Sequence, residues 1–264
     1  MLLAIDVGNS QTVVGLFAHD SWAATWRIAS DITRTADELQ VKMNEFFELR
    51  ESNLLDVDTV IIASVVPHLT MAWEQLARSI SGAQVFVVGP GIKTGITLGI
   101  SHPHEAGADR IANAVGAEFL YGAPVVVADF GTATNLDVVT RERSYKGGVI
   151  SPGVETSAEA LFARAARLSS VDLEAPAHAL GTSSVTAIQS GLIYGEAAKV
   201  DGLIERIFEE LGYSAPVVAT GGLVSLVAPY CKHIDVVNEN LTLEGLRVIA
   251  QRNTQARSND CAGV

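Results

Sequence analysis

The sequence predicts an α/β protein built from two similar domains, and three observations support this fold class. Short apolar runs alternate along the chain with longer segments of helical period. Two of the runs, LLAID at residues 2–6 and VVVAD at residues 125–129, end in an aspartate that is followed by one residue and then a glycine. These aspartates, Asp6 and Asp129, are separated by nearly half of the 264-residue chain, which indicates an internal duplication.

Composition narrows the possible functions. The chain is 48% hydrophobic and 18% charged and contains 23 glycines, which is typical of a folded globular protein. Its formal net charge of -12 argues against binding to a nucleic-acid backbone. The two cysteines, Cys231 and Cys261, show neither disulfide-framework nor zinc-site spacing. Without a recognisable targeting or membrane segment, the sequence predicts a cytoplasmic protein.

The first half shows strand and helix patterns in alternation. Residues 35–50 repeat apolar side chains at helical spacing, and Pro67 is suited to the first turn of another helix. A glycine-rich loop is expected at residues 89–99, before a helix at 107–121. The strand-like runs, which are rich in β-branched residues, lie at residues 2–6, 12–17, 57–66 and 83–89.

The second half begins with a strand, turn and strand at residues 123–139, which resemble the start of the chain. A boundary near residue 120 follows, giving an N-terminal domain at 1–120 and a C-terminal domain at 121–253. The C-terminal domain is expected to hold a long helix at 184–212 and a last helix at 241–253. Residues 254–264 are expected to be a frayed tail.

The turns after the two aspartates have the composition of phosphate-binding loops. Gly8 and the small polar residues after it offer backbone N–H groups and hydroxyls without bulk, and Asp6 is placed to hold Mg²⁺. The turn at Asp129–Thr134 offers the same groups, and a Gly221–Gly222 turn allows close approach of a nucleoside. Together the three turns predict an ATP clamp in a cleft between the domains. Either turn alone would also fit an ordinary hairpin. The sequence contains neither a P-loop nor a G-x-G-x-x-G fingerprint.

Seven segments together give a resemblance to a known family. They are DVGNSQTVVGLF, GIKTGI, HEAGADRIANAVGA, DFGTAT, GGVISPGVETSAEALFARAARL, AIQSGLIYGEAAKVDGL and VVATGG. In this order, from Met1 to about Asn253, they resemble type III pantothenate kinase of the acetate-kinase/actin/Hsp70 superfamily. The DVGN and DFGTA turns are shared across that superfamily, whereas GADR before an apolar helix and GGVISPG after the second turn are specific to the family.

The resemblance implies a fold and an activity. The fold would be two duplicated ribonuclease-H-like (actin-like ATPase) domains, with mixed sheets flanked by helices and an ATP cleft between them. The activity would be transfer of the γ-phosphate of ATP to pantothenate, giving 4'-phosphopantothenate in the first step of coenzyme A biosynthesis. It also implies Mg²⁺, a monovalent cation (K⁺ or NH₄⁺), and a homodimer with the substrate site near its interface.

The resemblance assigns roles residue by residue. Asp109 is implied as the catalytic base, and Arg110 can bind the pantothenate carboxylate with its planar fork. Asp129 is implied as the monovalent-cation ligand, and Asp6 as the magnesium ligand. The substrate-binding residues are Gly107, Ala108, Asp109, Arg110 and Ser184; the ATP-binding residues are Asp6, Val7, Gly8, Asn9, Ser10, Gln11, Thr12, Val13 and Thr132.

Structural explanations compete with these roles. Asp109 could merely complement a helix dipole, Arg110 could be a surface cation paired with Glu105 or Glu118, and Ser184 could be an N-cap. The chain also departs from the usual family pattern, with His102 for Asn, Ala106 for Val, Asn135 for Thr and Ser184 for Thr. Two other functions stay open: a sugar, glycerol or acetate kinase of the superfamily, and a non-catalytic regulatory or interaction protein of the same fold.

Overall fold

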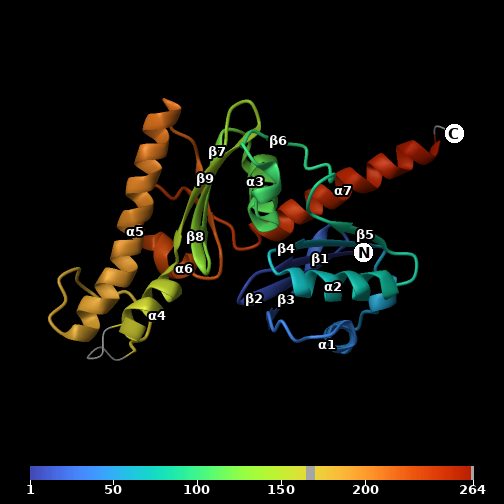
Figure 1. Ribbon diagram of the computed structural model, residues 1–264, viewed down its shortest axis with the longest axis horizontal. Helices are drawn as coiled ribbons and strands as arrows, with labels where there is room; N and C mark the ends of the chain where they lie inside the picture. Colours follow the sequence, from blue (N-terminus) through green and yellow to red (C-terminus); the bar gives the residue numbers. More distant parts are fainter. Residues whose placement is uncertain (165–169, 263–264) are drawn as a thin grey trace. The chain divides into compact units, whose positions relative to one another are not determined.

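The computed structural model describes residues 1–164 and 170–262 of the chain. It contains two compact units, one formed by Met1–Leu120 with the C-terminal helix α7 (Leu241–Ala262), the other by Tyr121–Asn240. Each unit has a mixed sheet and flanking helices, so the predicted α/β class is confirmed. Figure 1 shows the helices and strands of both units, coloured along the sequence.

The sheet of the first unit has the order β3-β2-β1-β4-β5. β1 pairs antiparallel with β2 and parallel with β4, so the central strand joins a hairpin to a crossover. Residues of β1 are buried on both of its faces, as their continuous apolar pattern predicts. The strands are β1 (Leu2–Val7), β2 (Gln11–Ala18), β3 (Ser21–Ala29), β4 (Thr59–Ser64) and β5 (Gln84–Val87).

Helices cover both faces of this sheet (Figure 1). α1 (Ala36–Glu48) and α2 (Pro67–Ser79) bury their apolar faces against alternate residues of β1, including Leu3 and Ile5. α7 contacts β1 and β4 from the other side and packs closely on α3 (Ala108–Tyr121). A Cβ on Gly245 of α7 would lie 1.8 Å from the Ala112 carbonyl oxygen, so only glycine allows this approach. Short elements η1 (Leu54–Asp56), β6 (Thr97–Leu98) and η2 (Pro103–Glu105) complete the unit.

In the second unit the strands follow the order β11-β10-β7-β8-β9, which repeats the topology of the first sheet. β7 pairs antiparallel with β8 and parallel with β10, as β1 does with β2 and β4. The duplication predicted from the two aspartate turns is therefore confirmed at the level of topology. The bounds are β7 (Val125–Phe130), β8 (Ala133–Val139), β9 (Ser144–Pro152), β10 (Val217–Thr220) and β11 (Val236–Val237).

The long helix α5 (Ser184–Leu211) packs along this second sheet (Figure 1), with Ile193, Val200 and Ile204 fully buried in the core. It ends at Gly212, which has φ +74 and closes the helix in the left-handed conformation that glycine tolerates. α4 (Val154–Arg164), α6 (Val224–Val227) and the short η3 (Ala228–Tyr230) complete the unit. Within residues 1–164 and 170–262, no helix is long and apolar enough to cross a bilayer.

The C-terminal region differs from the sequence-based expectation. Residues 241–253 were assigned to the second domain, but α7 packs on β1 and β4 of the first unit. Its buried apolar residues, among them Leu246 and Ile249, cover the face of that sheet that α1 and α2 leave open. The helix continues as far as Ala262, where a frayed tail was expected from residue 254; residues 263–264 lie outside the described part of the chain.

Candidate active site

The first aspartate turn joins β1 to β2. The strands pair as far as Val7 and Thr12, and the Gly8 N–H donates to the Gln11 carbonyl oxygen at 3.1 Å. A Cβ on Gly8 would lie 2.9 Å from that oxygen, so the turn requires a residue without a side chain. Asn9, Ser10 and Gln11 are exposed at the tip, while Asp6 is partly buried at the end of β1. The turn thus presents polar groups to solvent on a rigid base.

Two of the predicted ATP-binding residues face the interior. The side chains of Val7 and Thr12 are buried, so these residues could contact a phosphate only through their backbones. The Thr12 hydroxyl lies 2.9 Å from the hydroxyl of Ser30, whose N–H donates to the Ser10 carbonyl oxygen at 3.0 Å. Ser30, at the end of β3, therefore supports the turn. No motif in the sequence indicated this role, because the contact depends on strand pairing.

The second aspartate turn joins β7 to β8. Here the Gly131 N–H donates to the Ala133 carbonyl oxygen at 3.0 Å, the counterpart of the Gly8 bond. The carbonyl oxygen of Thr132 accepts two further hydrogen bonds, from the Gly153 N–H at 3.1 Å and from the Thr156 hydroxyl at 2.7 Å. Its carbonyl is thereby fixed by the N-terminus of α4, while the Thr132 side chain is exposed. The turn is therefore fixed both by the hydrogen bond within its hairpin and by the bonds from Gly153 and Thr156.

Gly221, in the predicted third turn, lies against this second turn. Its φ is +98, and a Cβ at this position would lie 2.5 Å from both Asp129 Oδ1 and the Phe130 carbonyl oxygen. The next residues reinforce the contact, since the Leu223 N–H donates to the Phe130 carbonyl oxygen at 3.0 Å. Two segments about ninety residues apart in the sequence therefore meet at the end of β7, around Asp129.

Oxygen donors gather beside Asp129. The strand pairings place Asn135 of β8 directly opposite Asp129, and Thr220 of β10 next to it on the other side. Cross-strand neighbours project their side chains from the same face of a sheet. Asn135 Oδ1 is buried and has no hydrogen-bond partner among the described residues. Carboxylate, amide and hydroxyl oxygens are the donors that hard cations such as K⁺ and Mg²⁺ prefer, so the residues fit a cation at Asp129.

The predicted substrate segment forms the start of α3. The Gly107 carbonyl oxygen accepts the first helical hydrogen bond, from Ile111, and Ala108 is buried. The Asp109 carboxylate folds back over the helix N-terminus, where its Oδ1 accepts the Arg110 N–H at 2.8 Å. This position stabilises the anion through the helix dipole. Asp109 and Arg110 are both partly exposed, which leaves them accessible to a small molecule.

The two acids considered as surface partners of Arg110 also lie close to other basic residues. Glu105 is within 4.0 Å of His102 and 3.9 Å of His104, and all three are exposed in η2 or immediately before it. Glu118 is buried and lies 3.9 Å from Arg252 of α7.

Ser184 is the first residue of α5 and is exposed, but it does not cap the helix. The N-cap is Ser183, whose hydroxyl accepts the Thr186 N–H at 3.2 Å in a reciprocal capping box. The N-cap role suggested for Ser184 was wrong by one residue. The Ser184 hydroxyl is therefore not required for the cap.

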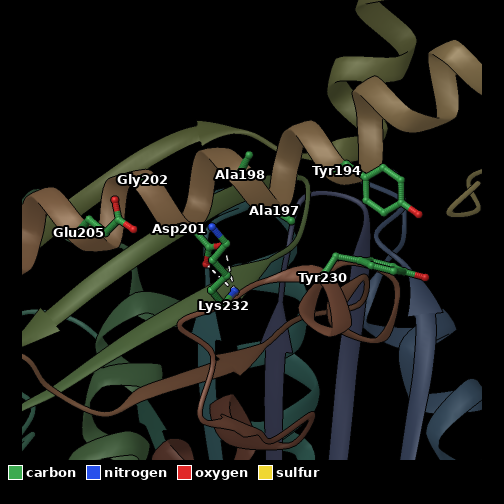
Figure 2. A pocket seen from close by; sticks show the side chains of 8 residues that line it. All are labelled: Tyr194, Ala197, Ala198, Asp201, Gly202, Glu205, Tyr230 and Lys232. Carbon is green, nitrogen blue, oxygen red and sulfur yellow. Dashed lines mark hydrogen bonds between the residues drawn. The ribbon is translucent and has the colours of Figure 1, made fainter. Parts of the chain in front are cut away.

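A hollow of about 260 Å³ lies elsewhere in the second unit, between α5 and the segment after η3 (Figure 2). Tyr194 and Tyr230 form one side, with ring centroids 5.1 Å apart. On the other side, the Asp201 carboxylate accepts the Lys232 N–H at 2.9 Å and the His233 N–H at 3.2 Å. None of the residues predicted from the sequence to bind substrate, ATP or metal lines this hollow.

Comparison with known proteins agrees with the motifs. A family model described as "Type III pantothenate kinase" matches residues 2–206. A protein named type III pantothenate kinase from Moorella thermoacetica is 44% identical over 254 residues, covering 96% of this chain and all of the relative. A protein of the same name from Geobacter sulfurreducens is 44% identical over 255 residues, covering 97% of this chain and all of the relative.

Solved structures show the same fold at low identity. Component A of (R)-2-hydroxyglutaryl-CoA dehydratase from Acidaminococcus fermentans has a TM-score of 0.57 at 15% identity, covering 95% of this chain and 96% of the other. A ROK hexokinase from Thermus thermophilus has a TM-score of 0.56 at 13% identity, covering 96% and 99%. The expected two-domain actin-like fold is confirmed by these similarities and by the repeated sheet topology.

Proposed function

Because the chain belongs to the type III pantothenate kinase family, we propose that it transfers the γ-phosphate of ATP to the primary hydroxyl of pantothenate. The product would be 4'-phosphopantothenate, made in the first step of coenzyme A synthesis. The observation that carries the proposal is the placement of Asp109 and Arg110 in the first turn of α3, within the family's GADR motif.

Asp109 and Arg110 would contact different groups of the acceptor substrate, pantothenate. Asp109 would align the pantothenate hydroxyl and accept its proton as the bond to phosphorus forms. The Arg110 N–H, at 2.8 Å from Oδ1, orients this carboxylate, which suits an acceptor of hydrogen bonds. Arg110 would bind the pantothenate carboxylate through its two parallel N–H groups. The Ser184 hydroxyl would add a further contact to the substrate.

The aspartate turns would bind the nucleotide. Residues 6–13 form one rigid hairpin and Thr132 lies at the tip of the other, and each turn is closed by a glycine N–H. Turns of this kind present backbone N–H groups to phosphate oxygens. Phosphoryl transfer needs mainly such alignment and charge stabilisation, because the protein contributes little covalent chemistry.

Two cations complete the proposal. Asp6 would hold Mg²⁺ directly or through its waters, since Mg²⁺ in kinases is usually bound by one or two carboxylates and by substrate phosphates. Asp129, with Asn135 opposite, would hold the monovalent cation, K⁺ or NH₄⁺. When bound, these ions would neutralise charge on the phosphates. The protein's part is to hold the carboxylates rigid at the ends of β1 and β7.

We also propose a homodimer in the cytoplasm. Gly191 and Gly195 lie on the exposed side of α5, where a Cβ would meet nothing within 4 Å, so this helix face can approach a second copy closely. Sedimentation at micromolar concentration would test the dimer, and a monomer would contradict it. The cytoplasm is supported by the absence of a disulfide pattern in the sequence.

The first experiment is a coupled ADP-release assay with ATP, Mg²⁺ and pantothenate, run separately in potassium and in sodium. Wild type and Asp109→Asn are compared with Glu105→Gln, an exposed acid four residues earlier. We expect potassium-dependent turnover that falls by about 10²- to 10⁴-fold in Asp109→Asn and is unchanged in Glu105→Gln. Turnover that survives in Asp109→Asn would contradict its role.

The same assay separates the competing functions. Phosphorylation of acetate, glycerol or a sugar in place of pantothenate would identify another kinase of the superfamily. Absence of ADP release with every substrate, together with absence of ATP binding in calorimetry, would favour a regulatory or interaction protein. The family membership and the intact Asp109, Arg110 and Asp129 favour the pantothenate kinase.

A further inference from the structure

A charged pair on α5 lies behind the second phosphate turn. Glu196 Oε2 and Lys199 Nζ are 2.7 Å apart, and the side chains are 5% and 31% exposed. Glu196 Oε1 is buried and has no hydrogen-bond partner among the described residues, so Lys199 is the counter-ion that the structure gives this carboxylate. Moving Lys199 away would leave the buried carboxylate without a compensating charge, which is strongly unfavourable.

Lys199 uses a second donor to contact the chain that precedes α4. Its Nζ donates to the Pro152 carbonyl oxygen at 2.9 Å. That carbonyl belongs to the peptide group that joins Pro152 to Gly153, and the N–H of the same group donates to the Thr132 carbonyl oxygen at 3.1 Å. A peptide group is planar, so fixing the direction of its C=O also fixes the direction of its N–H. Lys199 and Thr132 thus lie at opposite ends of one rigid unit.

We propose that Lys199, oriented by Glu196, is a positioning residue that holds the turn at Thr132 in the conformation that binds phosphate. The inference rests on the proposed function, because it takes Thr132 as a nucleotide contact. Loss of the Lys199 bond removes one constraint on the Pro152–Gly153 peptide and so weakens the Gly153 bond to the Thr132 carbonyl oxygen. The turn must then be ordered when the nucleotide binds, which lowers affinity.

The test uses a pair of variants that avoids leaving a bare carboxylate in the interior. Glu196→Gln removes the charge and keeps the Lys199 bond to Pro152. Glu196→Gln/Lys199→Met removes that bond as well, and Glu196→Gln/Lys199→Arg restores a donor. Lys42→Met is the control, because Lys42 pairs at 3.0 Å with Glu45, three residues away, on the surface of α1. The measurements are the calorimetric Kd for Mg-ADP, the KM values for ATP and pantothenate, and the melting temperature.

We expect the Kd for Mg-ADP and the KM for ATP to rise about five- to tenfold from Glu196→Gln to Glu196→Gln/Lys199→Met. This is less than the full cost of one charged hydrogen bond, because the Gly153 N–H bond to the Thr132 carbonyl oxygen remains. The KM for pantothenate should stay within about twofold. The Lys199→Arg version should recover most of the affinity, and Lys42→Met should match wild type. Equal Mg-ADP affinity in Glu196→Gln and Glu196→Gln/Lys199→Met would overturn the proposal. So would a rise in the KM for both ATP and pantothenate together with a lower melting temperature, because this pattern indicates a general structural defect.

Thr156→Val is an independent test of whether a fixed Thr132 carbonyl supports nucleotide binding. It can be used even if Glu196→Gln/Lys199→Met does not fold. It removes the other bond to the Thr132 carbonyl without touching α5, and should raise the same Kd for Mg-ADP; an unchanged Kd would overturn the proposal. Calorimetry with Mg-ADP needs no pantothenate. A wild type that binds Mg-ADP without phosphorylating pantothenate would therefore overturn the proposed function and still test this inference.

Discussion

Gly221 lies so close to Asp129 that a Cβ on the glycine would come within 2.5 Å of the carboxylate oxygen Oδ1. The contact brings the residue after β10 against the end of β7. It leaves no room for a side chain at position 221, beside the carboxylate that is proposed to bind a cation. It makes the second aspartate turn sensitive to a single methyl group.

Gly221→Ala is expected to lower both stability and nucleotide affinity. The new Cβ would meet Asp129 Oδ1 and the Phe130 carbonyl oxygen, and alanine is strained at a φ of +98. Strain of this kind costs about 1–3 kcal/mol. Thermal unfolding and calorimetry with Mg-ADP measure the two effects. Gly222→Ala is the matched control for stability, because a Cβ there meets nothing within 4 Å; equal losses of stability in both variants would contradict this explanation.

Asn135→Ala is expected to raise the potassium concentration needed for half-maximal activity by about three- to tenfold. The substitution removes an oxygen donor directly opposite Asp129 on the neighbouring strand. A neutral hydrogen-bonding or ligand group contributes about 0.5–1.5 kcal/mol, which corresponds to this range. The potassium-dependent rise in melting temperature gives a second readout. Asn135→Thr keeps an oxygen and should stay close to wild type; a normal potassium response in Asn135→Ala would exclude a role for the amide.

Asn253→Ala is expected to destabilise the first unit. The buried amide accepts the Lys93 N–H at 3.1 Å and donates to the Lys93 carbonyl oxygen at 3.0 Å, so it joins α7 to the glycine-rich loop. Leaving those backbone groups without partners should cost about 1–3 kcal/mol. Denaturant unfolding measures the change. Gln251→Ala, on the exposed side of the same helix, should change stability by less than about 0.5 kcal/mol.

The thiol of Cys231 is expected to resist alkylation. Burial, followed by the nearby charges of Asp201 and Glu196, raises its pKa from 9.0 to about 12. Its thiolate fraction at pH 8 is then about 10³-fold lower than that of an unperturbed thiol, and the thiolate is the reactive form. Iodoacetamide labelling of a Cys261→Ser variant, followed by mass spectrometry, measures the rate for Cys231 alone. Labelling as fast as that of the unfolded chain would contradict the prediction.

The same shift has a consequence for stability. Since the folded pKa lies above the unfolded value, the native state keeps its proton at a pH where the unfolded chain loses it. The contribution of Cys231 to stability is therefore complete below about pH 9 and is lost as the pH rises towards 12. In Cys231→Ala, the decline of stability over this range should be smaller than in wild type.

Helix boundaries were predictable because their signals are local. Thr35 caps α1 in a capping box with Glu38, Pro67 opens α2, and Gly212 ends α5. Each of these residues acts on backbone groups within a few positions, so the sequence alone contains the whole interaction. The Ser183 cap was missed by one residue because two adjacent serines offer the same chemistry.

The sequence by itself determined the α/β class, the duplication and the family, because motifs such as GADR and DFGTA are contiguous and their chemistry follows from residue type and spacing. Tertiary structure alone decided that α7 packs on the first sheet, that Gly221 meets Asp129, and that Lys199 contacts the peptide behind Thr132. Those contacts join segments tens to hundreds of residues apart. They depend on which face of a sheet remains uncovered and on which strands pair, and no local pattern encodes either.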